Sequence, residues 1–429
     1  INDMRMQNYD YADFAILYRT NAQSRILEEA LRKRGIPYKI YGGLSFYQRK
    51  EVKDVISYLR LIVNPHDEEA FKRVINYPAR GIGDTTLNKL VVAATDHNVS
   101  LWTVLNDPIG YALPVNNGTA KKLSDFRELI SGFIERNVKL SAEEIAAAVV
   151  KESGIVSTLF QDRSVEGISK QENLQELLKG IAEFCEIRRE EGTEHVSLAD
   201  FLSEVSLLTD QDNDKEEQAN KVTMMTVHAA KGLEFRNVFV VGLEEDLFPS
   251  AMSKDNPRAV EEERRLFYVA ITRAEENCVL THARSRYRNG QSTMCSPSRF
   301  LKDIDPKYIY TSADAVTTNG LLATRRSSVF QQPKAMEGEA YVSPVAQAVG
   351  RQARLTRMET ASLSSAPSSS SAPALSGLHV GAKVRHDRFG EGEVTAIEGE
   401  GGNAKATVSF AHFGQKQLLL KFARLTIVE

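Results

Sequence analysis

The sequence contains few cysteines and no long apolar run. Its three cysteines, Cys185, Cys278 and Cys295, lie far apart without the spacing of metal ligands. This argues against a disulfide framework or a zinc site and favours a reducing cytosol. No apolar segment approaches the ~20 residues needed to cross a bilayer, and no signal-peptide pattern opens the chain. We therefore expect a cytoplasmic protein with no membrane among its partners and no metal-ligating residues of its own.

A phosphate-binding loop is also missing. The pattern Gly-x-x-x-x-Gly-Lys-Ser/Thr, which cradles nucleotide phosphates and supplies a hydroxyl to Mg²⁺, occurs nowhere in the 429 residues. A complete P-loop ATPase site in this chain is therefore excluded. The first residue is Ile rather than Met, so we expect the chain to be a part of a longer protein.

The overall charge excludes a uniformly basic nucleic-acid binder. The net charge is −3 and the pI is about 6.3, whereas such a binder has a high pI. The charges are unevenly distributed: residues 19–60 hold ten Lys and Arg against four Asp and Glu, and residues 190–217 hold one Lys against ten acids. A basic face and an acidic face can coexist, and only the first needs to meet phosphate.

The first 40 residues alternate strand, helix and strand. Residues 13–18 are apolar enough for a buried strand, residues 25–34 have a helical pattern, and residues 36–41 return as a strand. Either Asn21 or Ser24 is a candidate cap for the helix. Short connections between such elements are typical of α/β domains.

Residues 41–217 are mostly helical by pattern. Apolar side chains from Val52 to Ile62 recur at helical spacing, and Asp67 can cap the helix that follows it. An acidic run at 210–217 is interpreted as a solvated hinge. The predicted helices are 68–75, 119–137, 142–152, 171–190 and 198–208.

The stretch 222–274 contains the most informative pattern. Two short β-rich runs, 222–227 and 237–241, flank a polar loop, and a helical pattern follows that ends at Thr272 and Arg273. Because a buried parallel strand presents functional groups from the loop at its carboxyl end, we expect the polar side chains of this loop at that edge of a sheet. These side chains are His228, Lys231 and Glu234.

The composition changes after residue 310. Residues 311–378 are rich in Ser, Ala, Thr and Pro and cannot bury enough apolar area to offset the entropy of ordering, so we predict a flexible linker. Residues 379–429 regain period-two alternation between Gly-rich turns. They predict a small SH3- or Tudor-like β-barrel.

Two motifs resemble a known family. Thr226-x-His228-x-x-Lys231-Gly232-Leu233-Glu234-Phe235 and Glu262-Glu263-Arg264-Arg265-Leu266-x-Tyr268-Val269-x-x-Thr272-Arg273-Ala274 resemble the last two motor motifs of the UvrD/Rep/PcrA group of superfamily 1 DNA helicases. Segments 18–25 and 42–54 resemble the same group.

The resemblance implies a specific architecture. A RecA-like, P-loop NTPase-like parallel-sheet domain of class α/β would comprise residues 1–40 and 218–310, split by a helical insertion domain at 41–217. The linker 311–378 and the barrel 379–429 would follow. The phosphate loop and the Mg²⁺ ligands would belong to a first motor domain upstream.

The resemblance also assigns nucleotide contacts. It implies that Arg273 acts on the γ-phosphate of ATP, where a guanidinium neutralises charge on the transferred phosphoryl group. It implies that Glu234, in a loop with Gly232, accepts a hydrogen bond from the ribose. Arg264 and Arg265, with Glu262 and Glu263, are interpreted as an internal ion-pair set that positions Arg273.

DNA contacts follow from the same resemblance. Thr226, His228, Arg19 and Asn21 are expected on the backbone of single-stranded DNA, and helix capping remains an alternative for Asn21. Lys231 is expected either on DNA or in an ion pair that braces the loop.

Two further DNA contacts are expected. Gly81-Ile82-Gly83, with Arg80 and Thr85, is expected against duplex DNA, although a bare Gly-x-Gly is more often a plain turn. Relatives have an aromatic residue where this chain has Asn289. Tyr287 is therefore a candidate replacement for base stacking.

These implications favour one function and leave one rival. The favoured function is the carboxy-terminal part of an ATP-dependent 3′-to-5′ DNA helicase of repair and replication, inactive alone, with ATP and Mg²⁺ as cofactors and single-stranded and duplex DNA as partners. RNA polymerase, through residues 379–429, and DNA-repair proteins are further candidate partners. The rival is a non-catalytic DNA- and RNA-polymerase-binding tether or regulator, which would not need the complete Arg273 and Glu234 motifs.

Overall fold

The structure is a computed structural model of the whole chain. It describes residues 1–212, 220–288, 291–310, 378–386, 389–399, 404–410, 414–423 and 425–428. Most of the acidic run, the linker and position 289 lie outside the described residues.

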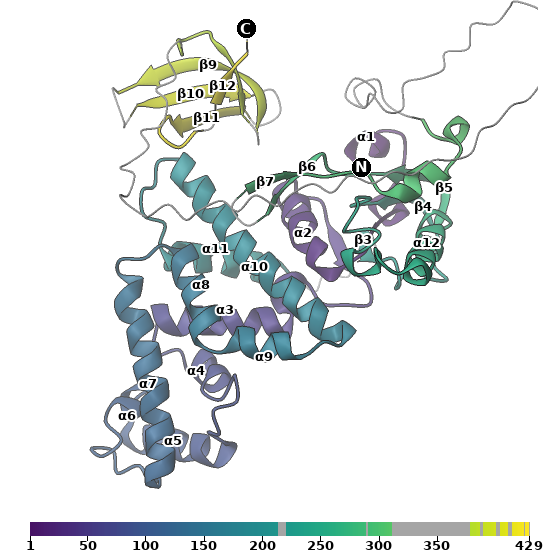
Figure 1. Cartoon of the computed structure of the whole chain (residues 1–429). Helices are drawn as coiled ribbons and strands as arrows, with labels where there is room; N and C mark the ends of the chain where they lie inside the picture. The colour runs from purple at the N-terminus through teal and green to yellow at the C-terminus, as the bar shows by residue number, and fades with distance from the viewer. Residues whose placement is uncertain are drawn as a thin grey trace, which may run out of the picture. The chain divides into compact units, whose positions relative to one another are not determined.

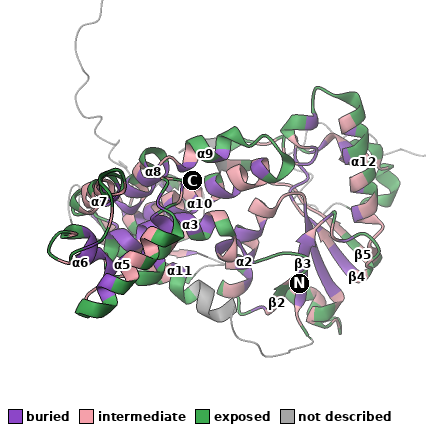
Figure 2. Ribbon diagram, turned by 90° about the horizontal axis from the view of Figure 1, so that it is seen from below, coloured by how far each residue is buried: buried purple, intermediate pink, exposed green. Residues whose placement is uncertain are grey.

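A five-stranded parallel sheet forms the α/β core, as predicted (Figure 1). Its strands lie in the order β2-β3-β1-β4-β5. The strands in the middle are buried along their length (Figure 2), because a parallel sheet is covered on both faces. The strands are β1 (Phe14–Tyr18), β2 (Tyr38–Ile40), β3 (Val222–Thr226), β4 (Phe235–Val240) and β5 (Ala274–Leu280).

Three helices accompany the strands of this sheet in the sequence: α1 (Asn2–Arg5), α2 (Ser24–Lys33) and α12 (Pro257–Ile271). The cap predicted for the second of these helices is wrong. Among the described residues, no side chain forms a capping hydrogen bond with α2; the amide oxygen of Gln23, its N-cap residue, instead accepts from the backbone N–H groups of Arg19 and Thr20, at 2.9 Å each, in the turn before the helix. The helix therefore starts from a short 3₁₀ turn, Asn21–Gln23, rather than from a capping Asn or Ser.

Helices α3 to α11 all lie between β2 and β3 in the sequence, and β2 and β3 are neighbours in the sheet. The chain therefore leaves the sheet at one strand and returns at the adjacent one. The helices are α3 (Lys50–Val63), α4 (Glu68–Val74), α5 (Asp84–His97), α6 (Leu101–Asn106), α7 (Asn117–Asn137), α8 (Ala142–Glu152), α9 (Ile155–Gln161), α10 (Val165–Glu190) and α11 (Leu198–Asp212).

One hydrophobic core joins these helices. Helices α3, α8 and α10 lie side by side in it (Figure 1). The apolar face predicted from Val52 to Ile62 is buried, and the predicted cap is confirmed, since Asp67 Oδ1 accepts from Ala70 N at 3.0 Å. Among the helices that the structure describes, none combines the length and the apolar composition that spanning a bilayer requires.

The carboxy-terminal residues form an antiparallel sheet in the order β11-β10-β9-β8-β12. Alternate residues of β10, among them Ala406, Val408 and Phe410, are buried, which confirms the predicted period of two. A separate hairpin pairs β6 (Ser285–Arg288) with β7 (Gln291–Met294). The strands of the sheet are β8 (Lys383–His386), β9 (Gly390–Glu398), β10 (Lys405–Phe410), β11 (Gly414–Leu419) and β12 (Leu425–Ile427).

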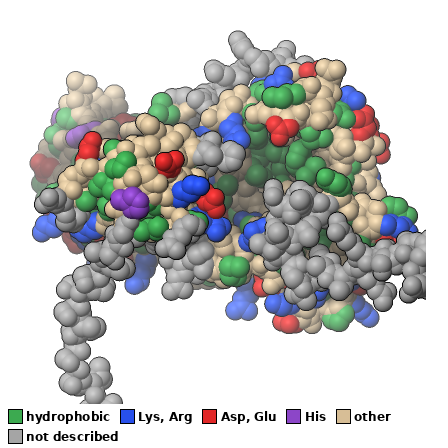
Figure 3. Space-filling model, turned by 90° about the horizontal axis from the view of Figure 1, so that it is seen from above, with side chains coloured by type: hydrophobic (Ala, Val, Ile, Leu, Met, Phe, Trp, Pro, Cys, Tyr) green, Lys and Arg blue, Asp and Glu red, His purple; other side chains and the backbone are tan. Residues whose placement is uncertain are grey.

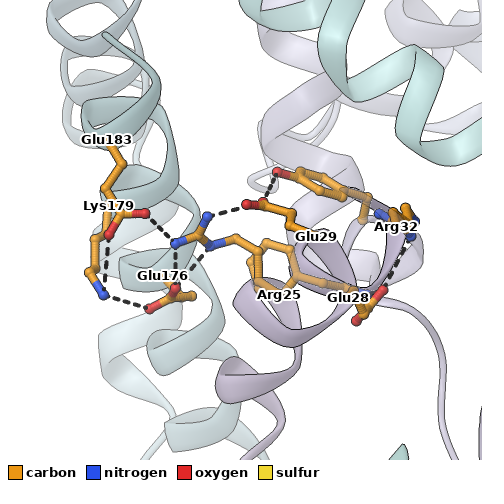
Figure 4. Close-up of polar contacts among 9 residues, drawn as sticks. Arg25, Glu28, Glu29, Arg32, Glu176, Lys179 and Glu183 are labelled. Carbon is orange, nitrogen blue, oxygen red and sulfur yellow. Dashed lines mark hydrogen bonds and ion pairs between the residues drawn. The ribbon is translucent and has the colours of Figure 1, made fainter. Parts of the chain in front are cut away.

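A buried arginine links α2 to α10 (Figure 4). The Arg25 side chain is only 3% exposed, and its guanidinium pairs with Glu29 at 3.0 Å and with Glu176 and Glu183 at 2.7 Å each. Gly180 leaves room for it, because a Cβ there would lie 3.0 Å from Arg25 Nη1. Burial opposes the charge of Arg25, but the three carboxylates outweigh burial and raise its pKa.

We predict that Arg25→Ala destabilises the protein strongly. The substitution leaves three partly buried carboxylates without their shared cation, which lowers the free energy of unfolding by roughly 3–5 kcal/mol. Urea unfolding followed by circular dichroism measures the effect.

Arg60→Ala is the matched control. Arg60 pairs with Asp67 at 2.8 Å, but its side chain is 41% exposed, so the loss is below about 1 kcal/mol. Equal losses for the two variants would contradict the structural role of Arg25.

Candidate functional site

The residues predicted around β1, β3, β4 and α12 lie at two opposite edges of the parallel sheet. Thr226, at the end of β3, is level with Tyr18, the last residue of β1. Asn237, near the start of β4, is level with Phe14, the first residue of β1. The loop 227–234 therefore runs from the carboxyl edge of the sheet back to its amino edge.

The expectation that all three polar residues of this loop share the carboxyl edge is therefore wrong. His228 follows Thr226 closely at that edge, whereas Glu234 directly precedes β4 at the amino edge. The reason is geometric: two consecutive parallel strands require the chain to return to the edge where it started. Lys231 lies within this returning loop and is exposed.

Arg273 and Glu234 are neighbours at the amino edge. The backbone N–H of Phe235 donates to Arg273 O at 2.9 Å, and Arg273 Nη1 donates to Leu233 O at 3.0 Å. Arg273 thus bonds to the residues on both sides of Glu234. Gly232, with φ +86°, lies in the left-handed region and lets the loop turn just before them.

Among the residues that the structure describes, the Arg273 guanidinium donates only to neutral oxygens. Besides Leu233 O, its acceptors are Val269 O at 3.1 Å and Thr272 Oγ1 at 3.1 Å. Within the described part of the chain, no carboxylate pairs with Arg273, and none of the hydrogen bonds or ion pairs involves the exposed Glu234 or Lys231 side chains. The edge therefore offers an uncompensated cation for an anion and a free acceptor for a hydroxyl group.

Arg19 is held at the carboxyl edge by a carboxylate from α12. Its Nε donates to Glu263 Oε2 at 2.8 Å and its Nη2 to Glu263 Oε1 at 2.6 Å. Glu263 is 5% exposed and also accepts from Ser253 Oγ at 3.3 Å. Such a two-pronged pair fixes the direction of a guanidinium as well as its position.

The ion-pair set expected within α12 is correct only in part. Arg265 pairs with Glu262 at 2.6 Å, and Arg264 pairs with Glu261 and Asp303. Glu263 instead faces the sheet.

Helical periodicity was the signal for this position of Glu263. It shares a buried face of α12 with Val260, Phe267 and Ala270. A carboxylate on that face needs a partner, which Arg19 supplies.

The other carboxyl-edge residues make weaker contacts. Thr226 Oγ1 accepts from Ala229 N at 3.3 Å, and Asn21 Oδ1 accepts from Arg49 Nη2 at 3.4 Å. Desolvation lowers the pKa of His228, Arg19 lowers it further, and Glu263 acts in the opposite direction. His228 is therefore a neutral imidazole at neutral pH, available for hydrogen bonding without charge.

Comparisons with known proteins identify the family of this chain. Residues 1–285 match the family model of the UvrD-like helicase C-terminal domain. The chain belongs to this UvrD-like family. Residues 380–426 match the PcrA/UvrD tudor domain, so the resemblance inferred from the motifs is confirmed.

Curated relatives are similar along almost the whole chain. The ATP-dependent DNA helicase PcrA of Staphylococcus aureus strain NCTC 8325 is 38% identical over 419 residues, 96% of this chain and 52% of the relative. DNA helicase II of Escherichia coli K12 is 36% identical over 417 residues, 97% of this chain and 52% of the relative. The chain thus spans about half the length of the curated relatives it matches.

The Gly81-Ile82-Gly83 segment of this UvrD-like chain opens α5. Gly81 has φ +70°, Gly83 directly precedes the helix, and Thr85 is exposed in its first turn. Ile82 is 2% exposed and its backbone N–H donates to Asn76 Oδ1 at 3.1 Å, so the two glycines are the exposed residues of this segment. Lys122 Nζ donates to Gly81 O at 3.1 Å and brings a cation to the same turn.

Arg80, which was expected to help at this turn, makes hydrogen bonds within the chain. Its guanidinium donates to Tyr58 Oη at 2.7 Å and to several backbone carbonyls, including Tyr77 O at 2.9 Å and Ser153 O at 3.2 Å. These bonds hold together segments of the helical part. Arg80 is therefore a structural residue.

Tyr287 lies in β6, level with Ser292 of β7. The hairpin is fixed by a residue that sequence reasoning missed, Glu244, which is 1% exposed and accepts from Arg286 Nη2 at 2.8 Å and Ala283 N at 2.7 Å. No cluster of three or more His, Cys, Asp or Glu suited to a metal occurs among the described residues.

We predict that His228 titrates below the ordinary histidine pKa of about 6.5. Folding lowers the pKa of His228. The contribution of His228 to the free energy of unfolding is therefore complete above the unfolded pKa of about 6.5, and it is lost as the pH falls through the folded pKa. Arg19→Gln removes a nearby cation, so the pKa of His228 rises. NMR titration of the histidine ring measures both values.

Arg236→Gln is the control. Arg236 lies at the start of β4 on the amino edge, paired with Glu276 at 2.7 Å, so its loss leaves the pKa of His228 unchanged. A shift of equal size in both variants would show that Arg19 does not act on His228.

Proposed function

We propose that this chain is the carboxy-terminal motor half of an ATP-dependent 3′-to-5′ DNA helicase. The observation that carries the proposal is the uncompensated Arg273 guanidinium beside the free Glu234 carboxylate at one edge of the sheet. Membership of the UvrD-like family supports it. A first motor domain would supply the phosphate loop that this sequence lacks.

Arg273 would act on the γ-phosphate. Bound ATP with Mg²⁺ supplies the phosphoryl group and the metal charge of the reaction. The guanidinium, held by carbonyl oxygens of its own domain, neutralises charge on the transferred group without losing its own charge to a carboxylate. Since it belongs to a different domain from the phosphate loop, it arrives only when the two motor domains close.

Glu234 would bind the ribose. An ionised carboxylate only accepts hydrogen bonds, so it suits a hydroxyl donor. Gly232 lets the loop turn just before Glu234. The exposed Lys231 is available to a phosphate of ATP or of DNA.

Single-stranded DNA would lie along the opposite edge. Arg19, Asn21, Thr226 and the neutral His228 offer donors to phosphate oxygens. One face of the molecule carries Lys and Arg side chains interspersed with Asp and Glu rather than a continuous basic surface (Figure 3). Binding would therefore rely on positioned donors more than on a broad electrostatic field.

The remaining parts complete the proposal. Residues 41–217 would form a domain inserted between motor segments 1–40 and 218–310, with the Gly81 turn against duplex DNA. Residues 379–429 would contact RNA polymerase, a role that rests only on the match to the PcrA/UvrD tudor domain. Residues 311–378 would connect the two.

We predict that the chain alone does not hydrolyse ATP, and that the helicase joining it to a first motor domain does so when single-stranded DNA is added. In that helicase, Arg273→Ala lowers kcat by roughly 10³–10⁵ because the transferred charge is no longer neutralised. Steady-state phosphate release measures the effect.

Arg265→Ala is the control from the same helix. Its side chain is 75% exposed and pairs only with Glu262 among the described residues, so turnover stays within about twofold of the unmodified protein. Turnover by the isolated chain, or an Arg273→Ala loss no larger than that of Arg265→Ala, would refute the proposal.

We predict a different signature for Glu234→Ala. Loss of a hydrogen bond between a carboxylate and a ribose hydroxyl weakens ground-state and transition-state binding alike, so KM for ATP rises by about tenfold or more while kcat changes little. Glu234→Gln, which keeps an acceptor oxygen without the charge, gives an intermediate KM. A fall in kcat at unchanged KM would rule out a ribose contact.

A further inference from the structure

Helix α12 connects the two edges of the sheet. Glu263, in its second turn, bonds to Arg19 at the carboxyl edge. Arg273 follows two residues after the last residue of the helix and lies at the amino edge beside β4. The eight residue steps from Glu263 to Ile271, the last residue of the helix, correspond to ~12 Å at 1.5 Å per residue.

At the carboxyl edge, the contacts of Glu263 restrict the movement of α12. Glu263 is almost fully buried, accepts two hydrogen bonds from one guanidinium, and is bonded by Ser253 as well. Arg19 is 21% exposed, and in the described residues its Nη1 donates to no protein group. Glu263 thus holds one side of the guanidinium and leaves the other side for a phosphate oxygen.

A second carboxylate lies near Arg19 but does not hold it in the same way. Burial raises the pKa of Glu172 in α10, while Arg19 and the Thr20 hydroxyl oppose that rise. Arg19 makes its hydrogen bonds to Glu263. The motion of Arg19 is therefore tied to α12 more closely than to α10.

We propose that Glu263 is a positioning residue that ties Arg19 to α12, so that DNA bound at Arg19 stabilises the helix that leads to Arg273. This inference rests on the proposed function, because it takes Arg19 as a contact to single-stranded DNA. A phosphate on Nη1 and a carboxylate on Nε and Nη2 neutralise the guanidinium from both sides. DNA bound at the carboxyl edge then orders α12, and α12 leads to Arg273 at the amino edge.

Hydrogen exchange of the 429-residue chain tests this without nucleotide. Amide exchange over Pro257–Ile271 is measured by mass spectrometry with and without an oligo-dT strand. In the unmodified chain, DNA slows exchange in this helix at least about threefold, because local opening must now break a three-part ion arrangement. In Glu263→Gln the oligonucleotide still binds, by fluorescence anisotropy, but exchange in α12 no longer responds to it.

Glu262→Gln is the matched control. Glu262 is the preceding carboxylate of the same helix, but it is exposed and pairs with Arg265, so this variant responds to DNA as the unmodified chain does. Arg19→Lys is a second variant, for the case that Glu263→Gln does not fold. Lysine keeps the charge but cannot make a bidentate contact with a carboxylate. DNA therefore no longer slows exchange in α12 in this variant either.

The outcomes separate the two proposals. If the unmodified chain does not bind oligo-dT, the proposed DNA contact fails and this inference fails with it. If the chain binds but exchange in α12 does not change, or changes equally in Glu263→Gln, only the positioning role of Glu263 is refuted. A purely structural Glu263 would lower the melting temperature of the variant and leave the DNA response of α12 intact.

Discussion

The parallel direction of β1, β3, β4 and β5 constrains the loops next to these strands, which bear Arg19, Glu234 and Arg273. A chain that ends one parallel strand must return to the other edge before it begins the next. Residues directly after a strand and residues directly before the next one are therefore held apart by the height of the sheet. Thr226 and Glu234, only eight positions apart, lie on opposite edges for this reason.

The same constraint explains how a large helical segment interrupts the sheet without disturbing it. Because β2 and β3 are adjacent, the chain can leave after one and return in the other wherever the register between them is kept. Arg25 adds a specific contact at this junction: one buried guanidinium gathers carboxylates from α2 and α10. Loss of Arg25 or of one of its carboxylate partners leaves uncompensated charge. The contact between α2 and α10 is therefore specific as well as stabilising.

Much of the fold was predictable from the sequence, because apolar periodicity and caps are local signals. The buried run of β1, the helix Ala142–Glu152 and the alternation in β10 all appear at their expected positions. The edge strand β5 was missed because Glu275 and Glu276 follow its first residue, Ala274, and it is only partly buried. The pairing of Arg19 with Glu263 was missed because it joins residues 244 positions apart. In the sequence, such a tertiary contact is indicated only indirectly, here by the carboxylate of Glu263 on the apolar face of α12.

Arg19 and Arg273 show how the environment gives one residue type two different electrostatic states. Arg19 has a buried carboxylate as its partner, which fixes its direction and takes up most of its charge. Arg273 has only carbonyl and hydroxyl oxygens, which fix its direction and leave its charge intact. The proposed role of Arg273 in phosphoryl transfer would need the second arrangement, because a carboxylate would compete with the phosphate. The proposed role of Arg19 on a DNA strand would suit the first, since a compensated guanidinium binds phosphate less tightly and exchanges it more readily.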